Sequence, residues 1–593
     1  LSACASVAPL DLDFAFLFKL CAPRRKLLPR RRERQAQPGS ADVPRKIEVL
    51  VQSAVDLPVR GGDGAKPLHP FVEVSFQGQT MATELKGGPN PMWNQMLHLE
   101  LSAPGGDWSQ KALINLHDEL TFNVFDKVKT AEADARESNV RTLRDERRWL
   151  GGFSLPFATL YRNGKVEGAF PLVMPPLLLG YKKDEQSKSS GLVPNSALSL
   201  FITVEPALPP VKDTERERSS TRNAKMQEFS KGWLKSVRMS LLREQRARHL
   251  LAFAPTADGE RMLLCSFVRP QPPPSALGSK MSEIARFVSL IPSLDDSVLG
   301  ASLDVWNTTE SFLELCAGDT EEHALLLCNC FKAMGKSAFV VLGDGVPEGR
   351  TAYVLTKDLL KKETTLWNAS TGKSYSTELL HCPLTSVGLV FDDTNIWANV
   401  QPYDEPHLID WHFDDARNWR PFFGGRGGFE EPDEMENVQA AELRYRTTSD
   451  EYRANIERDV EERVKQAFED ARGHRTTDWN RAVGAKLKPL LRRFEEHESG
   501  VRPLTAAEHD AALLQVSKSS RLVGFPINLT YTDVQPILDK VMHTNLWQAD
   551  GPKIQFAIAT YVHAYPNDVC SVWVYIVAVE DLRAGSATTR TVE

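Results

Sequence analysis

The chain has 593 residues, of which 42% are apolar and 25% are charged, as in ordinary soluble globular proteins. This length predicts three or more domains. The net charge of -7 and the pI near 6.1 argue against general binding of nucleic acid. The eight cysteines are scattered, without the spacing of a disulfide framework or a zinc site. We therefore expect no metal or other cofactor, and a reducing, cytoplasmic setting.

Residues 1–44 are predicted to be a basic N-terminal tail. Its apolar stretch, Ala3–Ala22, is interrupted by three charged residues, so it is too polar and too short to span a bilayer. The basic run Arg24–Arg34 follows this stretch instead of preceding it, which argues against a signal peptide. We favour a solvated linker here, with contact to anionic lipid or an acidic partner as the alternative. Because the chain begins with Leu1, we expect it to be a piece of a longer protein.

Residues 45–207 carry strand signals. Lys46–Val51 and Phe71–Phe76 alternate apolar and polar residues with period two. An Asn-Pro-x-Trp-Asn motif at 90–94 precedes another strand, and Leu120–Asp126 leads through a charged stretch to Trp149-Leu150-Gly151. This order of motifs resembles a C2 domain. The resemblance implies an antiparallel β-sandwich.

A C2 domain that binds calcium needs several carboxylates from two loops at one tip, because the ion takes six or more oxygen ligands. Asp63 and Asp126 stand at two such positions, but His69 and Val128 stand where acidic residues are expected. The charged insertion 131–148 is predicted to extend the second loop. Two carboxylates would leave calcium under-coordinated, so we expect a calcium-independent domain that contacts a protein or a membrane.

Residues 208–283 are predicted to be a linker made of a helix and a β-hairpin. Within 213–249, four large apolar residues recur about one turn apart: Phe229, Trp233, Val237 and Leu241. A basic amphipathic helix of this kind can lie on a membrane, but we favour packing against the rest of the chain. The hairpin is expected within 250–268, turning at Asp258-Gly259.

Residues 284–425 contain the motif Gly318-Asp319-Thr320, then a helical run, and then an apolar strand at 337–343. This pattern resembles the core of the transglutaminase-like (papain-type) α+β fold. In that fold Gly-Asp-Cys opens the helix that bears the nucleophile. Thr320 stands at the position of the cysteine.

The other two catalytic positions also lack the usual residues. Thr351 or Ala352 replaces the histidine, and Asn368 replaces the aspartate. A thiolate nucleophile requires a thiol whose pKa is lowered by a helix N-terminus and an imidazole, and a threonine hydroxyl cannot be ionised in this way. We therefore expect a pseudoenzyme with no catalytic residues. The remaining alternative is a thiol hydrolase in which Cys316 or Cys328 meets a histidine such as His381.

The last two predicted segments are an amphipathic helical segment at 426–500 and a C-terminal α/β segment at 501–593. Apolar residues at four-residue spacing predict a long helix: Tyr452, Ile456, Val460, Val464 and Phe468. This face is expected to pack within the protein or to pair with a partner helix. Residues 556–579 predict a closing hairpin that turns at Pro566-Asn567-Asp568.

Several motifs also occur in the order found in one known family. They are His69–Phe76, "GPNPMWN" at 88–94, "PLLLGY" at 176–181, "FVSLIP" at 287–292, "AGDTEEHALLLCN" at 317–329, "VPEGRTAYVL" at 346–355, "TNIWANVQ" at 394–401 and "YVHAYPNDVCSVWVY" at 561–575. On these motifs the chain from Arg45 onward resembles the C-terminal half of the coiled-coil and C2 domain-containing protein 2A family of the ciliary transition zone.

The resemblance implies a non-catalytic scaffold at the cilium basal body and transition zone. Such a scaffold supports cilium assembly and a membrane diffusion barrier. The implied partners are other proteins of the Meckel-syndrome module, including tectonic-like and small C2-like proteins, with peripheral membrane contact and no nucleic acid. The alternative function is a calcium-independent lipid- or peptide-binding adaptor at another membrane or at a centriolar site.

Overall fold

The computed structural model describes residues 45–581 except for short gaps, at 61–66, 110–111, 114–115, 117, 134–140, 176–177, 179, 183–195, 209–223, 242–247, 295–304, 359–362, 379–381, 425–426, 433–434, 505–510, 512, 514–519 and 551–553. The predicted basic tail at 1–44, together with Asp63 and His381, lies outside the described residues. Among the helices that are described, none is both long enough and apolar enough to cross a membrane.

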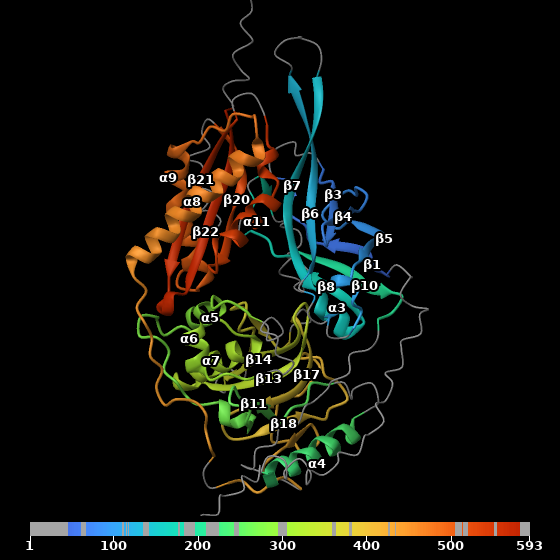
Figure 1. The fold of residues 1–593 in the computed structure, drawn as a ribbon, viewed down its shortest axis with the longest axis vertical. Coiled ribbons are helices and arrows are strands. Elements are labelled where there is room, and N and C mark those ends of the chain that lie inside the picture. Colours follow the sequence, from blue (N-terminus) through green and yellow to red (C-terminus); the bar gives the residue numbers. More distant parts are fainter. Residues whose placement is uncertain are drawn as a thin grey trace, which may run out of the picture. The chain divides into compact units, whose positions relative to one another are not determined.

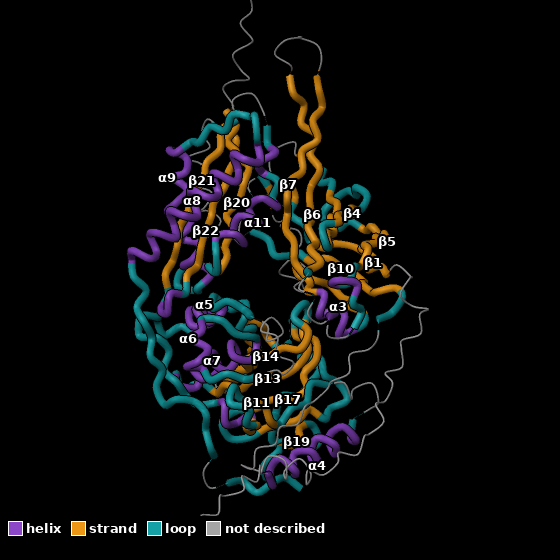
Figure 2. The backbone as a smooth tube through the Cα atoms, in the orientation of Figure 1, coloured by secondary structure: helices purple, strands orange, loops and turns teal. Residues whose placement is uncertain are grey.

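The N-terminal domain is a β-sandwich of two four-stranded antiparallel sheets (Figures 1 and 2). One sheet has the order β5-β1-β10-β8, formed by Met92–Leu101, Arg45–Val55, Ala197–Glu205 and Lys165–Pro171. The other has the order β4-β3-β6-β7, formed by Gln79–Ala82, Pro70–Phe76, Glu119–Ala133 and Arg141–Pro156. Alternate side chains enter the core, as Ile47, Val49 and Val51 of β1 do. The predicted C2-type sandwich is confirmed.

The described parts of the charged insertion, 131–133 and 141–148, are strands and not the predicted loop. Strands β6 and β7 continue their antiparallel ladder through most of it, as far as the pair Ala133 and Arg141. Backbone hydrogen bonds along the ladder do not depend on apolar side chains, so a charged composition did not end the strands. One consequence concerns the candidate calcium ligand Asp126. It lies inside β6 opposite Arg148 rather than in a flexible loop.

The described residues of the predicted linker, 224–241 and 248–283, are part of the next domain. Helix α4 (Ala224–Ser240) buries Trp233 and Val237 in the same apolar cluster as the helices of that domain. The Trp233 indole donates a hydrogen bond to the Pro421 carbonyl and packs edge-on against Phe422. The predicted hairpin is present as β11 (Phe253–Pro255) and β12 (Arg261–Leu263). Packing within the chain thus accounts for the apolar face of α4.

The second domain is built on a seven-stranded antiparallel sheet of order β16-β15-β14-β13-β17-β18-β19. The strands span, in that order, Ser374–Ser376, Glu363–Trp367, Gly349–Asp358, Ser337–Gly345, Leu384–Phe391, Ile396–Asn399 and Trp419–Pro421. Three helices share an apolar cluster with one face of the sheet: α5 (Met281–Ser289), α6 (Thr309–Leu315) and α7 (Thr320–Ala333). A separate cluster rich in aromatic residues covers the other face. This is an α+β domain, as predicted.

Residues 449–581 form one C-terminal domain, so the predicted division at residue 500 is not observed. Its sheet has the order β20-β22-β21, formed by Ser520–Thr530, Cys570–Asp581 and Gln555–Ala564. Helix α9 (Arg481–Glu498) packs on one face, whereas α8 (Asp450–Arg472) and α11 (Val534–His543) pack on the other (Figure 1). The apolar stripe predicted on α8 is therefore core, because a sheet with two apolar faces needs a cover on each side.

A buried ion pair joins the C-terminal domain to the α+β domain. The Arg286 guanidinium on α5 donates two hydrogen bonds of 3.0 Å to the Glu495 carboxylate on α9. Glu495 also accepts hydrogen bonds from three side chains of the C-terminal domain: Tyr565 at 2.7 Å, Ser571 at 2.7 Å and Trp573 at 2.6 Å. Burial alone would raise the pKa of Glu495, but Arg286 and these donors outweigh it and lower the pKa to about 2.

We expect Glu495→Gln to destabilise the protein by about 3–5 kcal/mol, because it leaves the Arg286 charge buried without its counter-charge. Urea unfolding at neutral pH measures this difference. The pair contributes stability above the unfolded-state pKa of about 4.3 and loses it as pH falls toward the folded-state pKa of about 2. The difference between wild type and variant should therefore shrink over that range.

Glu496→Gln is the matched control, since the neighbouring Glu496 forms surface ion pairs with Arg492 and Arg493 on its own helix. Such pairs are worth about 0.3–0.5 kcal/mol. Equal destabilisation by the two substitutions would show that the buried pair does not hold the domains together.

Candidate functional site

The first candidate site lies at the start of α7, where Thr320 is the first helical residue. Asp319 caps the helix by accepting hydrogen bonds from the backbone N–H groups of Glu321 and Glu322. Glu322 in turn accepts from the Asp319 backbone N–H, which completes a capping box. The Thr320 hydroxyl donates to Glu321 Oε2 at 2.8 Å. The helix N-terminus that would activate a nucleophile is thus satisfied by this segment's own carboxylates.

Thr351 and Ala352 are the two residues predicted to stand in place of the catalytic histidine, and the structure shows which of them faces α7. Ala352 and Val354 of β14 belong to the apolar cluster that includes α7, whereas the intervening Tyr353 belongs to the cluster on the opposite face. Side chains alternate along a strand, so Thr351 shares the face of Tyr353. Thr351 is buried there, opposite Gly343 of β13. Ala352 is consequently the residue that faces α7, and its methyl group cannot accept or donate a proton.

Asn368 lies on the face of the sheet opposite to α7. Its amide donates hydrogen bonds to the Tyr353 hydroxyl at 2.7 Å and to Glu348 at 2.8 Å. Its side-chain oxygen accepts from the backbone N–H groups of residues 370 and 371, so it also holds a turn. The residues named from sequence therefore do not converge. Thr320 and Ala352 belong to the α7 side, and Thr351 and Asn368 to the other.

The cysteines offered as alternative nucleophiles are poorly placed. Cys328 lies inside α7, and burial raises the pKa of its thiol well above the usual range. Cys316 is half-buried, burial raises its pKa, and its sulfur lies within hydrogen-bond distance of the Leu313 and Asn567 carbonyls. His323 is fully buried, and its Nε2 atom lies within hydrogen-bond distance of the Ile291 carbonyl oxygen, at 2.9 Å. Burial lowers the pKa of His323. These groups serve packing.

The second candidate site is the corner of the C2 domain around Asp126, which has no exposed surface. The Arg60 guanidinium donates two hydrogen bonds of 2.6 Å, one to each carboxylate oxygen. Oδ1 also accepts from the His69 backbone N–H at 2.9 Å, and Oδ2 accepts from the Tyr181 hydroxyl at 2.7 Å. All four donors come from segments far from Asp126 in the chain.

Two short strands bring the donors together. β2 (Val59–Arg60) pairs with β9 (Tyr181–Lys182), and Arg60 lies directly opposite Tyr181. Burial by itself would lower the pKa of Arg60, but the Asp126 charge and hydrogen bonds raise it. Burial and the same carboxylate also raise the pKa of Tyr181. The sequence did not point to either residue as a site residue, because nothing local to Arg60 or Tyr181 indicates that a short ladder aligns them.

The residues around Asp126 do not form a calcium-binding site. Asp126 gives its oxygen atoms to a guanidinium, a hydroxyl and a backbone amide, and His69 contributes a backbone donor rather than a carboxylate. The Val128 side chain is buried and supplies no oxygen ligand. In the described part of the chain, no group of three or more His, Cys, Asp or Glu residues is arranged to hold a metal ion. Arg60 supplies the positive charge that a cation would otherwise bring to Asp126.

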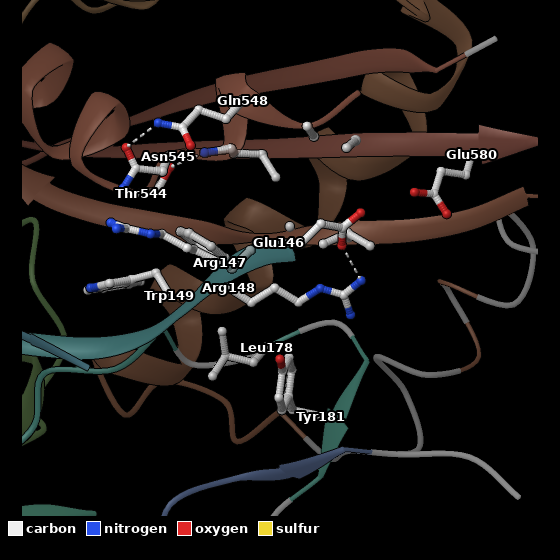
Figure 3. A pocket seen from close by; sticks show the side chains of 16 residues that line it. Glu146, Arg147, Arg148, Trp149, Leu178, Tyr181, Thr544, Asn545, Gln548 and Glu580 are labelled. Atoms are coloured by element: carbon white, nitrogen blue, oxygen red, sulfur yellow. Dashed lines mark hydrogen bonds and ion pairs between the residues drawn. The ribbon is translucent and has the colours of Figure 1, made fainter. Parts of the chain in front are cut away.

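A cavity of about 90 Å³ lies beside this corner (Figure 3). Glu146, Arg148, Trp149 and Tyr181 line it from the C2 side. Residues 523–525, 544–546 and 548–549, with Glu580, line it from the C-terminal domain. Arg148 donates a hydrogen bond of 3.0 Å to Glu146 on the same strand, β7. The two domains therefore meet at the corner of the sandwich that holds Asp126.

We expect Arg60→Ala to destabilise the protein by about 3–5 kcal/mol, because it leaves the Asp126 carboxylate buried without a counter-charge. Arg60→Ala combined with Asp126→Asn should recover part of the loss. Calcium at about 1 mM, enough to saturate weak extracellular sites, should leave the melting temperature of wild type unchanged. A calcium-dependent rise would contradict the assignment of Arg60 as the resident positive charge.

We also expect iodoacetamide at about pH 7.5 to leave Cys328 and Cys330 unmodified in the folded protein, because burial suppresses thiolate formation. Burial raises the pKa of Cys330 to about 12. Mass spectrometry of peptic peptides measures the labelling, and the same protein in urea provides the fully labelled control. Fast labelling of native Cys328 or Cys316 would instead support a thiol enzyme.

Three family models match parts of the chain. The C2 domain model matches residues 45–172, the CEP76 peptidase-like domain model matches 304–422, and the model for the C-terminal domain of centrosomal protein of 76 kDa matches 449–581. These spans fall within the sandwich, the α+β domain and the C-terminal domain described above. The α+β core is thus a peptidase-like domain.

Curated relatives cover most of the chain. Human protein CC2D2B is 29% identical over 95% of this chain and 42% of its own length. Coiled-coil and C2 domain-containing protein 2A of Drosophila melanogaster is 26% identical over 87% of this chain and 38% of its own length. Human centrosomal protein of 76 kDa is 23% identical over 61% of this chain and 57% of its own length. The chain spans less than half the length of the first two relatives, and over most of its own length it is similar to the coiled-coil and C2 domain-containing 2 proteins.

Proposed function

We propose that this chain is a non-catalytic scaffold of the ciliary transition zone, required for cilium assembly and for the membrane diffusion barrier. It acts through a calcium-independent C2 domain and an inactive peptidase-like domain of transglutaminase-like type. The family resemblance supports the ciliary location. Similarity to a centrosomal protein supports a place near the basal body. The partners are other proteins of the Meckel-syndrome module, including tectonic-like and small C2-like proteins.

The observation that carries the non-catalytic assignment is the set of side chains at the three catalytic positions. The nucleophile position holds Thr320, whose hydroxyl donates to Glu321. The candidate base position on the α7 side of β14 holds Ala352, and Asn368 lies on the far face of the sheet. A base and a nucleophile must lie within hydrogen-bond reach of each other for acyl transfer. This arrangement provides neither a thiol nor an imidazole.

A calcium-independent adaptor at a centriolar site is the second candidate. Two matched family models carry the name of a centrosomal protein, which favours it over an adaptor at an unrelated membrane. The transition-zone scaffold and the centriolar adaptor share the same chemistry and differ only in location. Localisation of the protein by microscopy therefore separates them. A thiol hydrolase that uses Cys316 or Cys328 requires a reactive thiol, which the labelling experiment above addresses.

We expect Thr320→Ala to restore ciliation as fully as wild type does in ciliated cells whose own copy of the gene is disrupted. A scaffold does not need the Thr320 hydroxyl. Glu495→Gln should fail to restore ciliation, because a loss of about 3–5 kcal/mol is a large share of a typical folding stability. The measurements are the fraction of ciliated cells and the position of the tagged protein relative to transition-zone and centriole markers.

Glu496→Gln controls for expression and handling, since it changes a neighbouring surface carboxylate. Loss of ciliation with Thr320→Ala, at normal protein abundance, would contradict the non-catalytic scaffold. Rescue accompanied by accumulation at centrioles without transition-zone signal would favour the centriolar adaptor instead.

A further inference from the structure

One face of the seven-stranded sheet carries an aromatic enclosure around a lysine. Lys357 lies near the end of β14, and side-chain alternation puts it on the face of Tyr353, opposite to α7. Its Nζ atom lies over two rings, 3.4 Å from the centre of Phe413 and 5.2 Å from the centre of Phe339. Nζ also donates a hydrogen bond of 2.6 Å to the Trp411 carbonyl oxygen. The Lys357 ammonium group therefore meets two ring faces and one acceptor.

The two rings belong to a larger aromatic cluster that fixes their positions. Phe413 stacks on Trp397 with ring centres 5.1 Å apart, and it meets Phe339 and Trp419 edge-on with ring centres 5.0 Å apart in each case. Phe339 and Trp397 lie on β13 and β18, whereas Phe413 lies on residues 400–418, which connect β18 to β19. We call residues 400–418 the covering segment. The enclosure exists only while the covering segment lies on the sheet.

Lys357 differs from another half-buried lysine that lies over a ring. The Nζ atom of Lys465, on α8, lies 5.9 Å from the centre of the Trp479 ring. Lys465 also forms an ion pair of 2.6 Å with Glu461 one turn earlier on the same helix. Lys357 forms no ion pair with a carboxylate in the described part of the chain, so its ring and carbonyl contacts hold it in place.

The surroundings of Lys357 also favour the neutral amine more than water does. Burial lowers the pKa of Lys357 from 10.5 to about 8, although the charges of Asp414 and Asp410 oppose the change. An ordinary lysine is almost entirely protonated at neutral pH. Lys357 therefore has a larger fraction of the neutral amine, which is the nucleophilic form of the side chain.

The distances around Nζ leave room for one methyl group. A methyl carbon lies about 1.5 Å from its nitrogen and packs best about 3.5–4.0 Å from a ring, so the nitrogen must lie about 5 Å from that ring. Phe339, at 5.2 Å, leaves this space, whereas Phe413, at 3.4 Å, does not. The Trp411 carbonyl requires that one N–H be kept. A monomethylated lysine therefore fits, and a trimethylated lysine does not.

The charge of the side chain distinguishes methylation from acylation at this site. A methylated lysine stays positively charged, and aromatic enclosures recognise methylated lysine because ring faces attract a cation. Acetylation removes the charge, and with it the attraction to Phe339 and Phe413. The enclosure therefore suits a methyl group and opposes an acetyl group.

We propose that Lys357 is a methylation site, and that the enclosure formed by Phe339, Phe413 and the Trp411 carbonyl fits its monomethylated form. The donor is a methylsulfonium compound used by a separate methyltransferase. The Lys357 ammonium first gives a proton to water. The neutral amine then attacks the methyl carbon, the N–C bond forms as the S–C bond breaks, and the donor leaves as a thioether. The product is a charged secondary ammonium that fastens the covering segment to the sheet.

The structural part of the proposal is tested in the full 593-residue chain, with Nε-methyl-lysine or Nε-acetyl-lysine placed at position 357 through a reassigned stop codon. Hydrogen exchange of peptides from the covering segment is measured by mass spectrometry. The methyl group should slow this exchange about three-fold, because it adds apolar contact with Phe339. The acetyl group should speed it about ten-fold, because the contact between cation and rings is lost. Unchanged exchange of C2-domain peptides confirms that each protein is folded.

Phe339→Leu provides the control for the ring. Lysine and methyl-lysine at position 357 are compared within this variant, so that any destabilisation by the substitution itself cancels. The methyl group should no longer slow the exchange of the covering segment. Methyl-lysine at position 465 is the matched control for the lysine, since the ion pair with Glu461 already holds that side chain. It should not slow the exchange of α8.

The modification itself is tested on the chain purified from ciliated cells. Mass spectrometry of its peptides should find the mass increment of one methyl group on Lys357 and none on Lys465. Absence of methylated Lys357, an equal effect of the methyl group in the Phe339→Leu background, or faster exchange with methyl-lysine would each overturn the proposal. None of these measurements depends on ciliation, so their failure would leave the scaffold function untouched.

Discussion

The buried carboxylate of Glu495 is the interaction on which the arrangement of the peptidase-like and C-terminal domains depends. It accepts hydrogen bonds from Arg286 on α5 and from three residues of the C-terminal domain. A charged carboxylate is tolerated in such a place only when it is paired and fully hydrogen-bonded. Each donor must therefore stay in position, which fixes α5, α9 and β22 relative to one another.

The same principle governs both candidate sites. At the start of α7, Asp319 and Glu322 satisfy the backbone N–H groups that could otherwise hold a substrate anion. At the C2 corner, Arg60 and Tyr181 satisfy the carboxylate that could otherwise hold a cation. Polar groups that bind ligands in active proteins of these folds are here bound to each other. Such internally satisfied sites stabilise the domains.

Local patterns in the sequence were enough for the main elements. Alternation predicted the sandwich strands, four-residue spacing predicted the buried face of α8, and a turn motif predicted the hairpin of β21 and β22. The wrong predictions share one cause. In the predicted loop, residues 131–133 and 141–148 pair in a β-ladder. In the predicted linker, residues 224–241 and 248–283 are part of a core, and the division at residue 500 cuts through one domain. Each depends on pairing or packing between residues distant in the chain, which composition does not reveal.

The sequence by itself determined which chemical groups are present: a threonine at position 320, no histidine at 351 or 352, and too few carboxylates for calcium. These facts follow from residue identity alone. Only the tertiary structure decided that Ala352 and not Thr351 faces α7, that Asn368 lies on the opposite face, and that Arg60 neutralises Asp126. The reason is physical, because strand register and a two-residue ladder decide which side chains meet, and both depend on hydrogen bonds between segments far apart in the chain.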